Sequence, residues 1–406
     1  MKYKLTTALS TVLIASVVLS ACGTEKQEAV NEEPKEQVEQ TEGSQNTDTV
    51  ENEEVEAEEV SIEDTITYSE VNTYKQIIDE LSKEKEGEAA DWNLASTLYA
   101  DGLKETIVGA DDSLDVAISA ALEAGANRQL DTVVALQVVD KTTQSYFYKK
   151  QKNLQSDVVA ALEEGNQEVA ELAFTELKYL AEEVLVPTAA KRDSYYSVDM
   201  QIQIENGLSI QEAALIQGNV DDLKVYKQMT DKTVYRSYYL AANSYAEKIA
   251  AAVQEGGAEK VDLQIKQAEA WGFYQAIKGS LSGGDEEAAA ALDTIFDLGQ
   301  TDPETMNADE VADLFVKTFV GKIIGYHGKV PVAIEEGNIT DARVEAMEAN
   351  VFMKAIELET IERLGEEQAA DLMEKGEAWF EAVSNENAEE ASSISAEIVE
   401  ALNQLF

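Results

Sequence analysis

The chain contains very little cysteine or histidine, the two residues on which much metal and redox chemistry depends. Cys22 is the only cysteine and His327 the only histidine among 406 residues. A single cysteine cannot form a disulfide within the chain. A single histidine cannot supply a helical zinc pair or the two Glu-x-x-His motifs of a di-iron bundle, and haem ligation is almost excluded by the same count. We therefore expect no cofactor and no histidine-based metal centre.

Signatures of common enzymes are also absent. The sequence has no G-x-S-x-G motif, no P-loop and no dinucleotide-binding fingerprint. A Ser-His-Asp triad would have to use His327, which stands between two glycines in GYHGK and is expected at a helix end or in a loop. A buried carboxylate could act as a general acid or base, but no pattern singles one out. The sequence therefore predicts a protein that is not an enzyme.

Basic residues are scarce. Lys and Arg number 31 against 80 Asp and Glu, which gives a formal net charge of −49. The N-terminal segment before Cys22 contributes +2 and residues 23–70 contribute −15, so residues 71–406 carry −36. Such a field excludes nucleic acid and anionic surfaces as partners. The pattern favours an acidic solvated surface, typical of external proteins of salt- or alkali-tolerant bacteria. The alternative is weak collection of cations on carboxylate clusters such as Glu163, Glu164, Glu168 and Glu171.

The N-terminus has the pattern of a secretory signal. The basic start MKYK precedes 16 mostly apolar residues, LTTALSTVLIASVVLS, and LSAC follows at residues 19–22 with Gly23 after it. This pattern resembles the lipobox of bacterial lipoproteins. The resemblance implies a signal peptide at 1–21 and a diacylglycerol on Cys22, and two acyl chains can anchor a protein stably. The alternative is a chance cysteine near an ordinary cleavage site. No second run approaches 18 apolar residues, so we expect the lipid to be the sole membrane attachment, on the extracytoplasmic face.

Residues 22–70 contain many Glu, Gln, Thr and Asn and few aromatic side chains. Such a segment cannot bury enough apolar surface to offset the entropy of ordering, so we predict a disordered acidic tether. As a coil it would span about 40 Å. An acidic interaction tail is the alternative.

The rest of the chain has the periodicity of helices. Apolar residues recur at i, i+3 and i+4, and Ala, Leu, Glu, Lys and Gln dominate, which predicts an all-α fold of antiparallel helix bundles at 71–200 and 201–406. Glycines, often followed by Asn, indicate where helices end and the next begin: Gly125, Gly165, Gly218, Gly256, Gly283 and Gly337. Ser209 with Glu212 and Asn307 with Glu310 indicate helix starts, and Pro303 after Asp302 suits a first turn.

Similar segments recur within the chain, which predicts two or three duplicated units. DKTTQSYFYKKQ at Asp140 matches DKTVYRSYYLAA at Asp231, and IQGNVDDLKVYKQM at Ile216 matches IEEGNITDARVEAM at Ile334. The spacing is too irregular for a solenoid of fixed period. Within Pro187–Ser209, SVDMQIQIENG alternates apolar and polar residues as a strand would, but its helical neighbours favour a helix.

Aromatic residues stand beside the few basic ones in four segments: SYFYKKQK, AAKRDSYYS, VYRSYYLAANSY and AEAWGFYQAIKG. They could be core stripes with tyrosine hydroxyls at the rim. They could instead line a cleft in which tyrosines stack a ligand and Arg or Lys pairs its anionic groups, and tyrosine with carboxylates could bind ferric iron without histidine. The candidate ligand-binding residues are Tyr148, Lys149, Lys150, Arg192, Tyr195, Tyr196, Arg236 and Tyr239.

A second resemblance concerns function. AEAWGFYQAIKGSLSGGDEEAAAALDTIF and EANVFMKAIELETIERL are similar in texture to helical extracytoplasmic segments that accompany bacterial iron permeases. It implies a metal-acquisition accessory and assigns no site residue. The sequence as a whole favours a lipid-anchored binding or accessory protein for an unknown small molecule, with a membrane transporter or envelope protein as partner. A structural or interaction protein of the cell envelope is the alternative.

Overall fold

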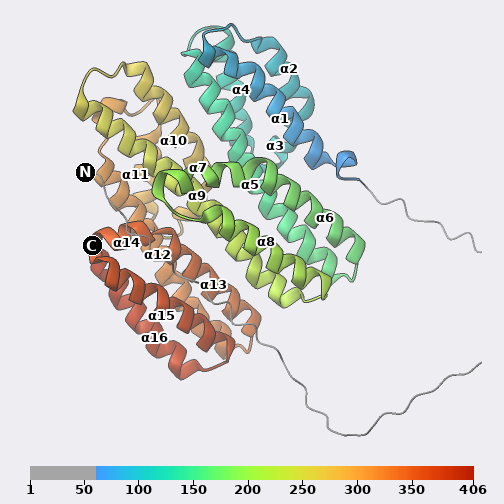
Figure 1. The fold of residues 1–406 in the computed structure, drawn as a ribbon, viewed down its shortest axis with the longest axis vertical. Coiled ribbons are helices and arrows are strands. Elements are labelled where there is room, and N and C mark those ends of the chain that lie inside the picture. The colour runs from blue at the N-terminus through green and yellow to red at the C-terminus, as the bar shows by residue number, and fades with distance from the viewer. Residues whose placement is uncertain (1–60) are drawn as a thin grey trace, which may run out of the picture. The chain divides into compact units, whose positions relative to one another are not determined.

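The computed structural model describes residues 61–406, and these residues form an all-α structure without strands, as the sequence predicts (Figure 1). The predicted signal peptide, Cys22 and most of the predicted tether lie outside the described residues. Within residues 61–406 no helix combines the length and the apolar character that crossing a membrane requires.

The α-helices are, in chain order, α1 (Ile66–Ser82), α2 (Trp92–Gly102), α3 (Lys104–Ala110), α4 (Asp112–Ala126), α5 (Thr132–Glu163), α6 (Gln167–Leu180), α7 (Val186–Tyr196), α8 (Met200–Ile216), α9 (Val220–Glu255), α10 (Lys260–Leu281), α11 (Glu286–Phe296), α12 (Ala308–Glu335), α13 (Ile339–Ala355), α14 (Glu357–Leu364), α15 (Glu366–Ser384) and α16 (Ala388–Leu402). Single turns of 3₁₀ or π-helix lie at Ile62–Asp64, Lys83–Glu86, Ala181–Leu185, Pro303–Thr305 and Asn403–Leu405.

Three glycine–asparagine junctions behave as predicted. Gly165, Gly218 and Gly337 have φ of +75°, +66° and +74° after the ends of α5, α8 and α12. This left-handed conformation is one that glycine adopts without a Cβ penalty. The following asparagine then caps the next helix, because its side chain accepts a hydrogen bond from a first-turn backbone amide of α6, α9 or α13. The segment at residues 200–206 is a helix and not a strand, as the sequence analysis favoured. Asn307 caps α12, as predicted.

Two local predictions are wrong, and the reason behind a third is different. Helix α4 ends at Ala126, next to Gly125 as predicted, but Gly125 does not take the left-handed conformation; its lack of a side chain makes room for Trp92, because a Cβ would lie 2.4 Å from that ring. Ser209 lies in the middle of α8, which already begins at Met200. His327 lies within α12 and is buried, so neither flanking glycine ends a helix there.

The folded body begins earlier than residue 71. Helix α1 starts at Ile66 behind the cap of Thr65, and Glu70 is buried. The Glu70 carboxylate accepts a hydrogen bond from the Tyr146 hydroxyl at 2.9 Å and pairs with Lys150 at 2.7 Å. The last residues of the predicted tether therefore belong to the body.

The two long helices α5 and α9 organise the packing. Helix α5 contacts α4, α6 and α10, and α9 contacts α8, α10 and α13, while α13 also packs on α12 and α15. Figure 1 shows α1–α4 beside the start of α5, and α12–α16 beyond α9. Contacts of α5 with α9 and α10 cross residue 200, where the sequence places a boundary between two bundles; that boundary stays a prediction.

Candidate functional site

Two buried Asp–Lys pairs lie on the long helices at the positions of the sequence echo. In α5 the Lys141 Nζ lies 2.6 Å from Asp140 Oδ2, and in α9 the Lys232 Nζ lies 2.6 Å from Asp231 Oδ2. A tyrosine hydroxyl from a neighbouring helix donates to each aspartate: Tyr74 to Asp140 at 2.6 Å, and Tyr148 to Asp231 at 2.7 Å. We name the surroundings of these pairs the Lys141 centre and the Lys232 centre.

The two centres share further parts. Lys141 lies 5.4 Å from the ring centroid of Phe273 in α10, and Lys232 lies 5.5 Å from that of Phe352 in α13. These rings stand 79 residues apart in the sequence. The same offset relates Glu269 to Glu348. The centres are therefore two copies of one arrangement, built from the pairs α5–α10 and α9–α13.

A third helix contributes a tyrosine and a lysine to each centre. In α9, Lys248 lies 4.8 Å from the ring of Tyr245; in α12, Lys329 lies 4.7 Å from the ring of Tyr326. Burial, and next the charge of Glu269, raises the pKa of Tyr245. Burial and Glu348 do the same for the pKa of Tyr326. In the sequence, each centre is marked by the pattern E-A-x-x-F on one helix and the pattern Y-x-x-K on another. That this combination occurs twice was not recognised in the sequence analysis.

The Lys141 centre holds positive charge without matching carboxylates. Lys141 pairs with Asp140, but among residues 61–406 no carboxylate oxygen lies within 4 Å of the charged nitrogens of Lys191, Arg192 or Lys248. Arg192 is 6% exposed, and its Nε and Nη1 have no hydrogen-bond partner. Its guanidinium carbon lies 5.9 Å from the Tyr245 ring. We call Lys141, Lys191, Arg192, Tyr245 and Lys248 the Arg192 cluster.

The positively charged side chains of the Arg192 cluster lie close enough to repel one another. Desolvation, followed by the positive charge of Lys141, lowers the pKa of Lys191. Desolvation, followed by the charge of Arg192, lowers the pKa of Lys248. Lys191 and Tyr195 are exposed at the surface, while Lys141 and Arg192 are buried beneath them. Lowered lysine pKa values beside an unpartnered guanidinium are the conditions under which an anion is attracted.

The eight predicted ligand-binding residues do not lie together. Tyr148, Arg236 and Tyr239 are buried in the core at 3%, 1% and 1% exposure. Tyr239 packs against Phe315 and Phe319, and the Arg236 Nη2 lies 3.3 Å from Glu357.

The predicted lysines of α5 are paired with carboxylates within the protein. Lys149 pairs with Asp111 at 3.1 Å, and Lys150 pairs with Glu70. The structure brings together only the α7 members, Arg192, Tyr195 and Tyr196, and sets them beside Tyr245 and Lys248 of α9.

An acidic groove begins next to this cluster. Tyr195 and Tyr196 donate hydrogen bonds to Glu247 at 3.3 and 3.2 Å, and Glu247 faces a hollow of about 470 Å³ between α9, α12 and α14. Burial raises the pKa of Glu247, and it raises that of Glu359 across the hollow. The lining residues, which define the acidic groove, are Asn243, Glu247, Ala308, Asp309, Ala312, Asp313, Glu359, Glu362 and Arg363.

His327 is buried beside an aromatic ring and a serine. Its ring stacks on Trp379 with centroids 3.8 Å apart, and its Nδ1 lies 2.8 Å from Ser395 Oγ. Burial lowers its pKa to about 4, so the ring is neutral near pH 7. In the described part of the chain, no three His, Cys, Asp or Glu side chains converge as metal ligands. Glu163, one of the carboxylates proposed to collect cations, pairs with Lys224 at 2.5 Å.

Comparison with known proteins finds no matching family model, no matching curated protein and no matching solved structure.

Proposed function

We propose that the protein is a lipid-anchored, non-enzymatic binding protein of the extracytoplasmic face, and that its ligand is a small anion held by the Arg192 cluster. One observation carries the proposal. In a body of charge −36, an almost fully buried guanidinium keeps two of its nitrogens, Nε and Nη1, unpartnered beside three lysines and a tyrosine. An unsatisfied charged donor is costly when buried, and an anionic ligand would remove that cost.

The chemistry of the cluster indicates the kind of anion. A guanidinium can bind a carboxylate or phosphate with two parallel hydrogen bonds. Tyr195, which lies 4.4 Å from Lys248 and is 47% exposed, offers an aromatic face at the entrance. The repulsive field of the rest of the body would slow the approach of anions, so local positive charge is needed for capture.

Binding of citrate, phosphate and sulfate, each at constant ionic strength, tests the proposal by titration calorimetry. At least one anion should bind saturably, and Arg192→Gln should weaken it roughly tenfold or more, the scale of a charged hydrogen bond. The matched control is Lys260→Gln, which removes an equal charge from an exposed pair with Asp302. Absence of binding by all three anions, or equal losses in both variants, would contradict the proposal.

The anchor is tested separately. The sequence LSAC at residues 19–22 supports lipidation of Cys22. Cys22→Ala should release the protein from the membrane fraction, because the remaining chain offers no second apolar run of sufficient length. Cell fractionation with immunoblotting measures this, and retention of the variant at the parental level would reject the lipid anchor.

A further inference from the structure

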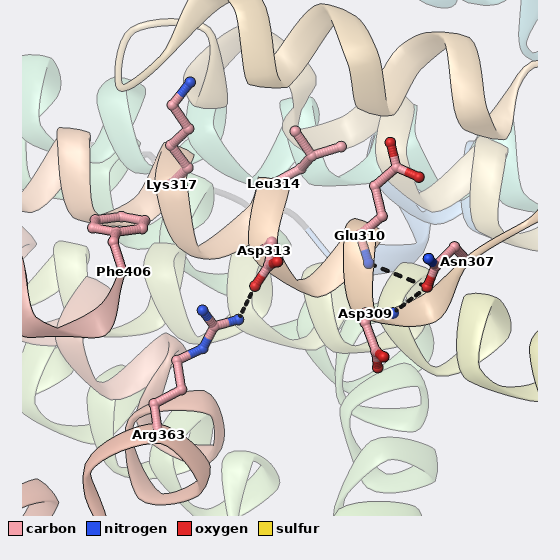
Figure 2. A pocket seen from close by; sticks show the side chains of 8 residues that line it. All are labelled: Asn307, Asp309, Glu310, Asp313, Leu314, Lys317, Arg363 and Phe406. Carbon is pink, nitrogen blue, oxygen red and sulfur yellow. Dashed lines mark hydrogen bonds and ion pairs between the residues drawn. The ribbon is translucent and has the colours of Figure 1, made fainter.

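The acidic groove continues into a second hollow along α12. That hollow, of about 540 Å³, is lined from Asn307 and Leu314 to Phe406, and it shares Asp309, Asp313 and Arg363 with the first. Figure 2 shows Arg363 extending toward Asp313 on α12, and both residues line both hollows. The two hollows therefore form one elongated depression, with Glu247 at one end and Phe406 at the other.

Negative charge in the depression exceeds what its cations neutralise. Arg363 is already occupied by Asp313 at 2.7 Å, Glu359 at 3.3 Å and the carbonyl of Leu405 at 3.0 Å. Among residues 61–406, Glu247 and Glu362 have no Lys or Arg nitrogen within 4 Å. Two carboxylates therefore face the first hollow without a cation.

A buried amide side chain lines the same hollow. Asn243 is 4% exposed, and its amide Nδ2 donates to Glu247 Oε1 at 3.0 Å. Its Oδ1 has no hydrogen-bond partner. A buried amide oxygen without a donor is uncommon in folded proteins, because losing its hydrogen bonds to water costs free energy. A donor supplied by a ligand would satisfy it.

The other end of the depression is apolar. Leu314 lines it, and Phe406 exposes 68% of its surface beside Leu314 and Lys317. An exposed aromatic ring next to an acidic channel can accept the hydrocarbon part of a ligand whose charged head lies further in. The two chemically different ends fit an amphipathic molecule better than a bare ion, which would need converging carboxylates that the described residues lack.

We propose that the acidic groove is a second binding site, which takes an organic ammonium ion with an apolar chain. Its ammonium group donates to Asn243 Oδ1, Glu247 and Glu362, and its chain extends along α12 toward Leu314 and Phe406. The site is separate from the Arg192 cluster and selects the opposite charge, although Glu247 and Lys248 are neighbours on α9.

The probe is n-hexylammonium chloride, titrated into the parental protein by calorimetry at low ionic strength. We expect saturable binding, no binding of 1-hexanol, and no displacement by equimolar Ca²⁺. Asn243→Leu should weaken binding roughly tenfold, because it removes a hydrogen-bond acceptor for a charged donor. Glu362→Gln, at an exposed position that the fold does not need, should weaken it about threefold, within the range of exposed ion pairs.

Glu377→Gln is the matched control, because Glu377 is exposed on α15 and lies outside the groove. It should leave the affinity unchanged. If Asn243→Leu does not fold, Glu362→Gln against Glu377→Gln decides. Equal affinity of these two variants, absence of saturable binding, equal binding of 1-hexanol, or displacement by Ca²⁺ would each overturn the proposal.

Discussion

Within residues 61–406, Lys232 and Lys329 are each paired with a carboxylate at close range, whereas Lys191, Arg192 and Lys248 beside Lys141 are not. Lys232 pairs with Asp231 and also with Glu348 at 2.9 Å, and Lys329 pairs with Glu345 at 3.1 Å. In the Lys141 centre the counterpart of Glu345 is Lys266, which stands 79 residues earlier. One substitution between otherwise equivalent helices thus replaces a carboxylate by another cation.

The difference extends to α7. Helix α7 supplies Lys191 and Arg192 to the Lys141 centre. Burial alone would lower the pKa of Lys232, but the charges of Asp231 and Glu348 hold it above its usual value. Desolvation and neighbouring cations lower the pKa of Lys191 and Lys248. The comparison teaches that one packing arrangement can hold its central lysine between two carboxylates in one copy and beside a buried guanidinium without an ion-pair partner among the described residues in the other.

Removing the central lysines should show the largest effect. Lys232→Met strands two carboxylates, so we expect the free energy of unfolding to fall by about 3–5 kcal/mol, as for other broken buried pairs. Lys141→Met strands only Asp140, which keeps Tyr74 and Gln144 as donors. Its loss should be smaller by about 1.5–3 kcal/mol, one charged hydrogen bond. Urea denaturation followed by circular dichroism measures both, and equal losses would remove the distinction between the centres.

The two copies also differ in how closely their paired helices approach each other. Ser145 donates to the carbonyl of Gly272 at 2.7 Å, and a Cβ on Gly272 would lie 2.4 Å from Lys141 Cβ. In the other copy Arg236 and Val351 occupy these positions.

Gly272→Ala should therefore overpack the α5–α10 contact and cost about 1–3 kcal/mol. Val351→Ala, at a half-buried site, should cost about 1 kcal/mol through lost apolar burial. Thermal unfolding compares the two variants, and a larger loss in Val351→Ala would show that the close approach is not needed.

Local signals in the sequence predicted much of the fold. Gly165–Asn166, Gly218–Asn219 and Gly337–Asn338 could be recognised because a left-handed residue followed by a cap depends only on neighbours in the chain. The Asp–Lys echo was also visible. Gly125 lies at the end of α4 as predicted, but it serves helix packing against Trp92 and not a left-handed cap. Ser209 misled because a capping pattern can occur within a helix.

The candidate site was predicted only in part, for a physical reason. Tyr148 and Tyr239 carry the same residue types as Tyr195, and only the direction in which each helix faces separates the core from the surface. Tyr245 and Lys248 come from α9 and Glu269 comes from α10, so they meet only through the packing of two helices, a long-range feature. Arg192 was identified because cations are rare in this chain; its missing partners became visible only in three dimensions.

Two variants, each of which places at one position the residue type of its counterpart, test the comparison most sharply and should change stability least. They concern Lys266 and Glu345. Lys266→Glu gives Lys248 the kind of partner that Lys329 has in Glu345, so the Lys141 centre becomes neutralised like its copy. We expect the binding of the best anion among citrate, phosphate and sulfate to weaken roughly tenfold. Stability should change by no more than about 1 kcal/mol, because the new pair is partly exposed.

The reciprocal variant Glu345→Lys is the control for overall charge. It makes the body less acidic by two charges and should leave the affinity of the Arg192 cluster within about twofold, since the Lys232 centre lies beyond the contact range of Arg192 and salt screens distant charges. Calorimetry on both variants separates local pairing from the general field. If Glu345→Lys strengthens binding as much as Lys266→Glu weakens it, the whole-body field governs anion capture and the difference between the two centres is incidental.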